Sequence, residues 1–125
     1  MGWSRKAAGE QAEQRAQRWL RARGLTPITH NYRCRLGEVD LIMADGETLV
    51  FVEVRWRTHG QYGGAAASVD RRKQRRLTLA ARHYLGRYPN QARRPCRFDV
   101  LGLEPDGDDG IRYQWIANAF YASEH

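Results

Sequence analysis

The sequence is poor in cysteine and lysine, and it has no long run of apolar residues. Cysteine occurs only at Cys34 and Cys96, which are too few for a zinc site, so we expect free, buried thiols. No stretch approaches the roughly 18 apolar residues that a membrane-spanning helix needs. The N-terminal residues also lack the apolar segment of a secretory signal, so we expect a cytoplasmic protein without a membrane partner.

Lysine is scarce because arginine takes its place. All but two of the 21 basic residues are arginine, and the exceptions are Lys6 and Lys73. The formal net charge of +7 favours a polyanionic partner but does not identify one. With so strong a preference, an arginine can stand in this chain at a position where lysine is usual.

Two common catalytic patterns are missing as well. The glycines at 60, 63 and 64 are not followed by the Gly-Lys-Ser/Thr of a phosphate-binding P-loop. The 4 histidines are scattered, and no Ser-His-Asp pattern stands out. We expect residues 58–68 to be a flexible loop instead, in which Tyr62 could stack on a base or sugar.

The remaining pattern predicts an α/β domain. Hydrophobic periodicity predicts a helix from about Arg5 to Arg23 and another from Val69 or Asp70 to Gly86. With 125 residues, the chain has room for one domain, spanning residues 1–125. The order αβββαβ predicts a mixed sheet flanked by helices. The expected strands are residues 28–35, 38–43, 48–57, 97–103 and a short last one at 111–116.

An acidic residue interrupts the most apolar of these strands. Residues 49–57 are typical of a central strand covered on both faces, where an ionised Glu53 is costly unless it is paired or bound to a metal. A hairpin with Asp45-Gly46 as its loop would place Glu38 opposite Glu53 and Asp40 diagonal to it. A shift of two residues would place Asp40 directly opposite Glu53. Either register gathers these acids on one face of the sheet.

The acidic patch has two interpretations. A hard divalent cation would relieve the repulsion between the carboxylates. Alternatively, Arg55 and Arg57 neutralise them in a ladder of ion pairs. Glu13 lies at the edge of the apolar face of the first helix, from which it could reach over the sheet or remain solvated.

Positive charge gathers at the start of the second helix. A helix N-terminus favours anions, and arginine binds phosphate through paired donors, so this surface is a candidate for nucleic-acid binding. A solvated charged face is the alternative. The candidate nucleic-acid-binding residues are Arg57, Arg71, Arg72, Lys73, Arg75 and Arg76.

These residues together resemble a known family over nearly the whole chain. The matching segments are Gly9-x-x-Ala12-Glu13-x-x-Ala16-x-x-Trp19-Leu20, Asn31-Tyr-Arg-Cys-Arg-Leu-Gly37-Glu38-Val-Asp40, Phe51-Val-Glu53-Val-Arg55-x-Arg57, Lys73-Gln-x-Arg76-Leu, Arg97-Phe-Asp99-Val and Trp115-Ile-x-Asn118-Ala-Phe120. They resemble the YraN-like family of bacterial proteins. That family is placed in the restriction-endonuclease-like PD-(D/E)XK superfamily and is similar to archaeal Holliday-junction resolvases.

The resemblance implies a restriction-endonuclease-like αβββαβ core and a catalytic site. Asp40 matches the motif aspartate, Glu53 matches the acid of the (D/E)-X-K segment, and Glu13 matches the helix acid of the resolvase-like branch. It implies a Mg²⁺ or Mn²⁺ ion on Asp40, Glu53 and the Val54 carbonyl, and a homodimer as in the resolvases. Glu38 would be a further acid near the site or the structural partner of an arginine.

Arg55 departs from this family pattern, because it stands where the lysine belongs. A guanidinium stays charged, so Arg55 cannot act as a base, although it could stabilise charge in the transition state. Lys73 lies on the same helix face as Leu77 and Tyr84, so it either replaces that lysine or caps the core. We expect a metal-dependent nuclease acting on DNA, structured or branched DNA included. The alternatives are a nucleic-acid-binding protein that has lost turnover and an accessory subunit of a DNA-processing complex.

Overall fold

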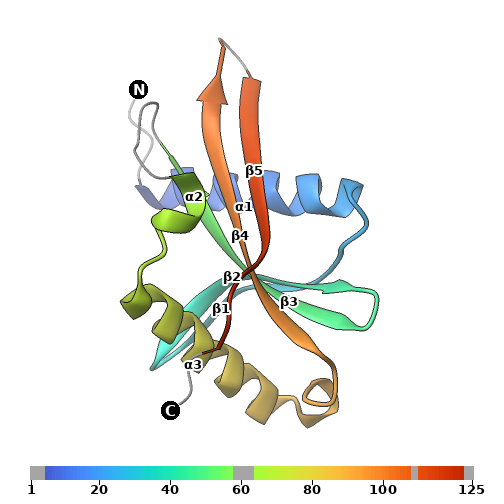
Figure 1. Cartoon of the computed structure of the whole chain (residues 1–125). Coiled ribbons are helices and arrows are strands. Elements are labelled where there is room, and N and C mark those ends of the chain that lie inside the picture. Colours follow the sequence, from blue (N-terminus) through green and yellow to red (C-terminus); the bar gives the residue numbers. More distant parts are fainter. Residues whose placement is uncertain (1–4, 58–63, 108–109, 123–125) are drawn as a thin grey trace.

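The computed structural model describes residues 5–57, 64–107 and 110–122, without the side chains of residues 5–8 and 66. Within these ranges the chain forms helices, strands and one short 3₁₀ segment (Figure 1). In chain order they are α1 (Arg5–Ala22), β1 (Thr26–Cys34), β2 (Gly37–Asp45), β3 (Thr48–Trp56), α2 (Gly64–Ala67), α3 (Arg71–Arg87), η1 (Pro89–Gln91), β4 (Cys96–Asp106) and β5 (Gly110–Phe120).

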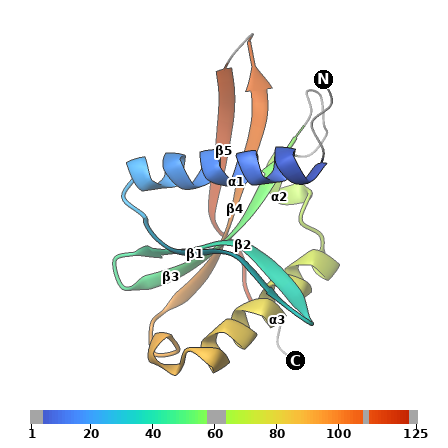
Figure 2. The same ribbon diagram turned by 180° about the vertical axis from the view of Figure 1, so that it is seen from behind.

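The described strands form a single five-stranded sheet in the order β1-β2-β3-β4-β5. The β3–β4 pair is parallel and the other pairs are antiparallel, because α2 and α3 carry the chain across the sheet between β3 and β4. Helix α1 covers one face of the sheet and α3 covers the other, as the two opposite views show (Figures 1 and 2). The predicted mixed sheet flanked by helices is confirmed, and it agrees with a restriction-endonuclease-like core.

The core has two layers, one on each face of the sheet. Phe51 packs with Leu77 and Tyr84 of α3, whereas Val52 points the other way and packs with Ala16 and Leu20 of α1. Strand β3 is therefore covered on both faces, as its nearly continuous apolar run predicts.

Glycine and aspartate residues end α1, begin α3 and let α3 pack closely on the sheet. After α1, Gly24 has a φ of +100°, a conformation that suits glycine and ends the helix. Asp70 caps α3, because its carboxylate accepts the backbone N–H of Lys73 at 2.9 Å. Gly37 at the start of β2 lies against the Arg76 carbonyl, where a Cβ atom would clash, so α3 rests directly on the β1–β2 turn.

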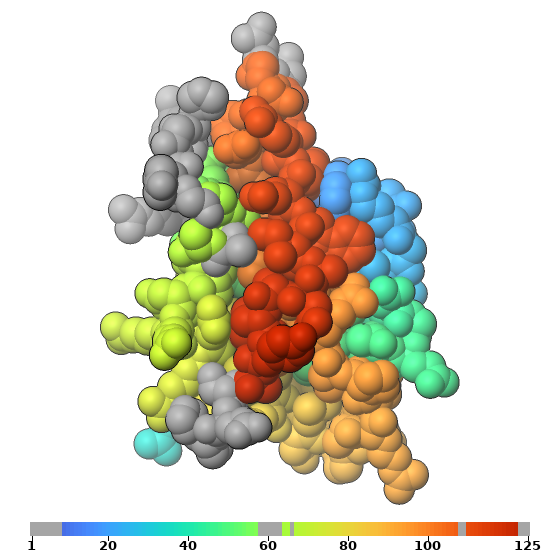
Figure 3. Space-filling view, in the orientation of Figure 1, coloured from blue at the N-terminus to red at the C-terminus, as the bar shows by residue number. Residues whose placement is uncertain are grey.

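Helix α2 lies inside the segment for which the sequence predicts only a loop. It packs on β4 so closely that a Cβ atom added to Gly102 would lie 2.5 Å from the Cβ of Ala65. Figure 3 shows β5 crossing the same face of the molecule beside α2 and α3. The predicted loop position of Tyr62 lies outside the described residues.

Three other expectations need correction. The loop between β2 and β3 is Gly46-Glu47, so the register predicted from an Asp45-Gly46 loop is wrong by two residues. Strands β4 and β5 are longer than predicted and end at Asp106 and Phe120. Both cysteines are free, but Cys34 is only half-buried and Cys96 is exposed.

None of the helices in the described ranges is both long enough and apolar enough to cross a membrane.

Candidate active site

Pairing between β2 and β3 brings two acidic residues together. The paired ladder ends at Leu41 and Val52, and just beyond it the side chains of Asp40 and Glu53 meet. This is the second of the two registers that the sequence allows. Glu53 shares the α3 face of β3 with Phe51, while Asp40 meets Glu53 on one side and Glu13 of α1 on the other.

Asp40 is held by its neighbours on β3. Its Oδ2 accepts the backbone N–H of Val54 at 2.8 Å, and its side chain is also hydrogen-bonded to that of Glu53. Burial raises the pKa of Asp40 well above its ordinary value, and the negative charge of Glu53 raises it further. The two acids are therefore close enough to share a proton.

Glu13 of α1 approaches Asp40 from the other side. Its side chain is hydrogen-bonded to Asn31 and to Asp40, and burial raises its pKa. Asn31 has a φ of +50°, a left-handed conformation that asparagine tolerates better than most residues. Of the two positions that the sequence allows for Glu13, the structure has the one that reaches over the sheet.

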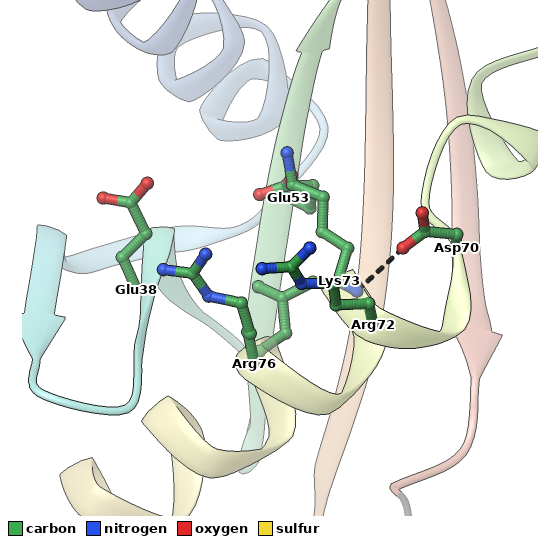
Figure 4. Close-up of a pocket in the computed structure, with 7 residues that line it drawn as sticks. Glu38, Glu53, Asp70, Arg72, Lys73 and Arg76 are labelled. Carbon is green, nitrogen blue, oxygen red and sulfur yellow. Dashed lines mark hydrogen bonds and ion pairs between the residues drawn. The ribbon is translucent and has the colours of Figure 1, made fainter.

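Two cations contact Glu53 from the opposite direction. The Lys73 Nζ lies 3.1 Å from Glu53 Oε2, and a terminal guanidinium nitrogen of Arg55 lies 3.6 Å from the same oxygen. Glu53 itself is buried, so these contacts replace much of its hydration. Figure 4 shows Lys73 rising from α3 toward Glu53 on β3.

Arg55 is also tied to the segment that follows α2. Its Nε donates to Ser68 Oγ at 3.1 Å, and the Ser68 hydroxyl donates to the Ala65 carbonyl at 2.6 Å. Arg57 is buried beyond this point and lines a separate hollow with Gln114. The predicted ladder of Arg55 and Arg57 is thus present at Arg55, while Arg57 lies away from the surface proposed for nucleic acid.

A pocket of about 240 Å³ opens beside Glu53. Basic side chains from the first two turns of α3 surround its mouth, and the predicted basic residues Arg71 and Arg75 are exposed outside its lining. The lining residues are Glu38, Glu53, Asp70, Arg72, Lys73, Arg76 and Leu77 (Figure 4). The pocket therefore lies between the acid of β3 and the basic side chains of α3, with three acidic and three basic residues in its lining.

Glu38 lines the pocket and is also the partner of an arginine. Its Oε2 lies 3.2 Å from Arg33 Nε, and both side chains are largely exposed. Its carboxylate is thus paired with an arginine of the neighbouring strand.

The donor set suits a hard divalent cation. In the part of the chain that the structure describes, no group of three or more His, Cys, Asp or Glu is arranged to hold an ion. Asp40 and Glu53 nevertheless present adjacent carboxylate oxygens, and a divalent cation between them would offset the repulsion of two negative charges. Mg²⁺ is usually held in this way, by one or two carboxylates with water and substrate phosphate. The residues present therefore fit such an ion.

Two contacts near the site were not foreseen. Asn31 orients Glu13, and Ser68 anchors Arg55. Asn31 lies in one of the segments that resemble the YraN-like family. That resemblance is the sequence signal that could have marked Asn31 as a residue near the site. Nothing in the local sequence marks Ser68, because its partner Arg55 lies 13 residues away on β3.

Known proteins resemble this chain closely. A sequence model described as "Uncharacterised protein family UPF0102" matches residues 12–103. The UPF0102 protein of Alcanivorax borkumensis is 59% identical over 119 residues, which cover 95% of each chain. That of Aeromonas hydrophila is 57% identical over 118 residues, covering 94% of this chain and 87% of the relative. That of Pseudomonas entomophila is 50% identical over 117 residues, covering 94% and 95%.

Proposed function

The chain belongs to the UPF0102 family, the YraN-like group of PD-(D/E)XK type, and on that premise we propose that it is a metal-dependent nuclease acting on DNA. The observation that carries the proposal is the pair formed by Asp40 and Glu53. Two adjacent carboxylates, one with a strongly raised pKa, are costly to the fold and useful to a metal. Glu53 also lines a pocket to which α3 contributes Arg72, Lys73 and Arg76.

The metal would be Mg²⁺ or Mn²⁺, held by Asp40, Glu53 and the Val54 carbonyl. When bound, such an ion lowers the pKa of water and polarises a phosphoryl oxygen. The Val54 N–H holds the carboxylate of Asp40 in place, and Glu13 contacts the same carboxylate from α1. These contacts orient Asp40 before any ligand arrives.

The positive residues of α3 would hold the nucleic acid. Arg72 and Arg76 line the pocket, where paired guanidinium donors could grip phosphates on either side of the bond to be cleaved. Arg71 and Arg75, which are exposed on the same helix, would extend this surface along the backbone. Such contacts give affinity without sequence readout. A preference for branched DNA and a homodimeric form rest on the resemblance to resolvases.

Cleavage assays test the proposal directly. Linear, nicked and four-way DNA would be incubated with Mg²⁺ or Mn²⁺, and we expect at least one substrate to be cut. Asp40→Asn should abolish cutting, because it removes a charged ligand while keeping an oxygen that can accept the Val54 N–H. Glu47→Gln is a matched control, since Glu47 is an exposed acid of the β2–β3 loop. Full activity of Asp40→Asn would remove the proposed site.

A DNA-binding protein without turnover is the second candidate. It is favoured by the two ion pairs that Lys73 and Arg55 make with Glu53, since these neutralise the acid without a metal. Tight binding of DNA by a wild-type protein that cleaves none of the substrates would support it. If the protein neither bound nor cleaved DNA, an accessory role beside another subunit would be the remaining option.

A further inference from the structure

Lys73 holds a position that the other basic residues of α3 do not share. Its Nζ makes the 3.1 Å contact with Glu53, whereas Arg72 and Arg76 line the pocket without a salt bridge to that acid. Its side chain is only about 42% exposed, so it is neither a free surface charge nor a buried one. The ammonium group therefore lies between the acid of β3 and the pocket.

Arg55, by contrast, is committed elsewhere. Its Nε is bound to Ser68, its contact with Glu53 is longer, and it is absent from the lining of the pocket. With its Nε held by Ser68, Arg55 has only its terminal nitrogens left to turn, and one of these already faces Glu53. The cation already facing the pocket comes from α3.

Building on the proposed nuclease function, we propose that Lys73, rather than Arg55, supplies the cation that contacts the scissile phosphate. An ammonium is a compact point charge with three donors, so it can keep one on Glu53 and direct another to a phosphate oxygen. Arg55 then serves to position Glu53 and to join β3 to the segment after α2. The lysine that β3 lacks is thus provided by a helix on the same face of the sheet.

Kinetics of matched variants test this assignment. Lys73→Gln should lower kcat by about 10²-fold or more, with a much smaller change in KM for DNA, because removal of one donor to the transition state has that effect in other enzymes. Lys73→Arg should restore part of the loss, since it restores the charge with a different shape. Arg55→Gln should lower kcat by less than about tenfold. Equal kcat values for Lys73→Gln and wild type, or a larger loss in Arg55→Gln, would overturn the proposal.

Metal binding separates a contact with phosphate from a role in holding the ion. Thermal shift with Mn²⁺ alone should give Lys73→Gln an affinity equal to or higher than that of wild type, because a cation beside Glu53 opposes a second cation. Asp40→Asn should lose the shift. If Lys73→Gln also lost the shift, Lys73 would be part of the metal site's scaffold and the proposal would be wrong.

A spectroscopic measurement remains informative even without turnover. The chain has only two lysines, so ¹⁵N-lysine labelling gives two ammonium signals, and Lys6→Arg assigns them. With Ca²⁺ in place of Mg²⁺, adding a short DNA duplex should shift the Lys73 signal in wild type. An unchanged Lys73 signal in a protein saturated with DNA would refute the contact. A shifted signal in a protein that never cleaves DNA would overturn the proposed nuclease function while supporting the contact of Lys73 with phosphate.

Discussion

Asp40→Asn should make the protein more stable at pH 7 in the absence of metal. Burial and the neighbouring Glu53 raise the pKa of Asp40 well above its ordinary value of 3.8. The folded protein therefore binds this proton more tightly than the unfolded chain does. As the pH rises from about 3.8 through the folded pKa, wild type loses stability, and the loss is complete above the folded pKa. Asparagine at position 40 removes the titrating carboxylate and with it this loss.

The size of the effect follows from proton linkage. One proton changes the free energy of unfolding by at most about 1.4 kcal/mol per pH unit. In a domain of this length, 1 kcal/mol corresponds to roughly 3–5 °C in melting temperature. The melting-temperature advantage of Asp40→Asn should therefore grow by up to about 4–7 °C per pH unit inside this window and then become constant.

The assay is thermal unfolding from pH 3.5 to pH 8, followed by circular dichroism, in EDTA and again in Mn²⁺. Glu47→Gln is the control and should follow wild type. Mn²⁺ at 100 times its dissociation constant would stabilise wild type by about 2.7 kcal/mol. The difference in melting temperature between Asp40→Asn and wild type should therefore shrink or change sign. A metal-free Asp40→Asn that is no more stable than wild type at pH 7, or an advantage that does not change with pH, would refute the reasoning.

Three further predictions concern residues around the site. Glu13→Gln should also stabilise the metal-free protein at neutral pH, but by less than Asp40→Asn, because the pKa of Glu13 is raised less; the same pH series measures it, and a loss of stability would contradict it. Asp99→Ala should lower the free energy of unfolding, measured in urea, by about 3–5 kcal/mol. The reason is that fully buried Asp99 binds Arg97, Trp115 and the backbone N–H of Asn118. A loss below about 1 kcal/mol would mean that this network contributes little. The double variant Arg72→Gln/Arg76→Gln should reduce the magnitude of the slope of log affinity for duplex DNA against log salt concentration by about 1.8, which is about 0.9 for each phosphate contact. An unchanged slope would show that neither arginine contacts the DNA backbone.

The local pattern of the sequence predicted most elements correctly. Helix periodicity identified α1 and α3 nearly to the residue, because each buries one apolar stripe against the sheet. Of the apolar residues expected on the inner face of α3, Leu77, Ala80, Ala81 and Tyr84 are buried and Leu85 is half-buried. Strand β5 was predicted too short, since its alternating exposure leaves few apolar residues to mark its end.

The hairpin register could not be decided locally. Asp45-Gly46 is a good turn sequence, yet the turn closes one residue later, with Gly46 at a φ of +60°. Both registers keep Phe51 and Glu53 on the same face, so the hydrophobic pattern does not distinguish them. The proximity of Asp40 to Glu53 was predictable because both registers bring the two residues together, whereas the register itself was not.

Contacts between distant segments account for the rest. Whether Lys73 pairs with Glu53 or caps the core depends on how α3 lies on the sheet, and that is set partly by the contact between Gly37 and the Arg76 carbonyl. The contacts of Asp99 with Trp115 and with the backbone of Asn118 join β4 to β5 across 16 and 19 residues of sequence. Such contacts depend on tertiary packing, which periodicity does not record.

The close approach of Gly102 to Ala65 also constrains how this family can evolve. These two positions share a volume that holds only one methyl group, so a larger residue at 102 requires either glycine at 65 or a displaced α2. Since Ser68 follows α2 and holds Arg55, a displaced α2 would free that arginine. Relatives with alanine at 102 should therefore carry compensating changes at 65 or at 68. Correlated changes between position 102 of β4 and positions 65 and 68 would show that the packing of α2 on β4 and the anchoring of Arg55 are coupled.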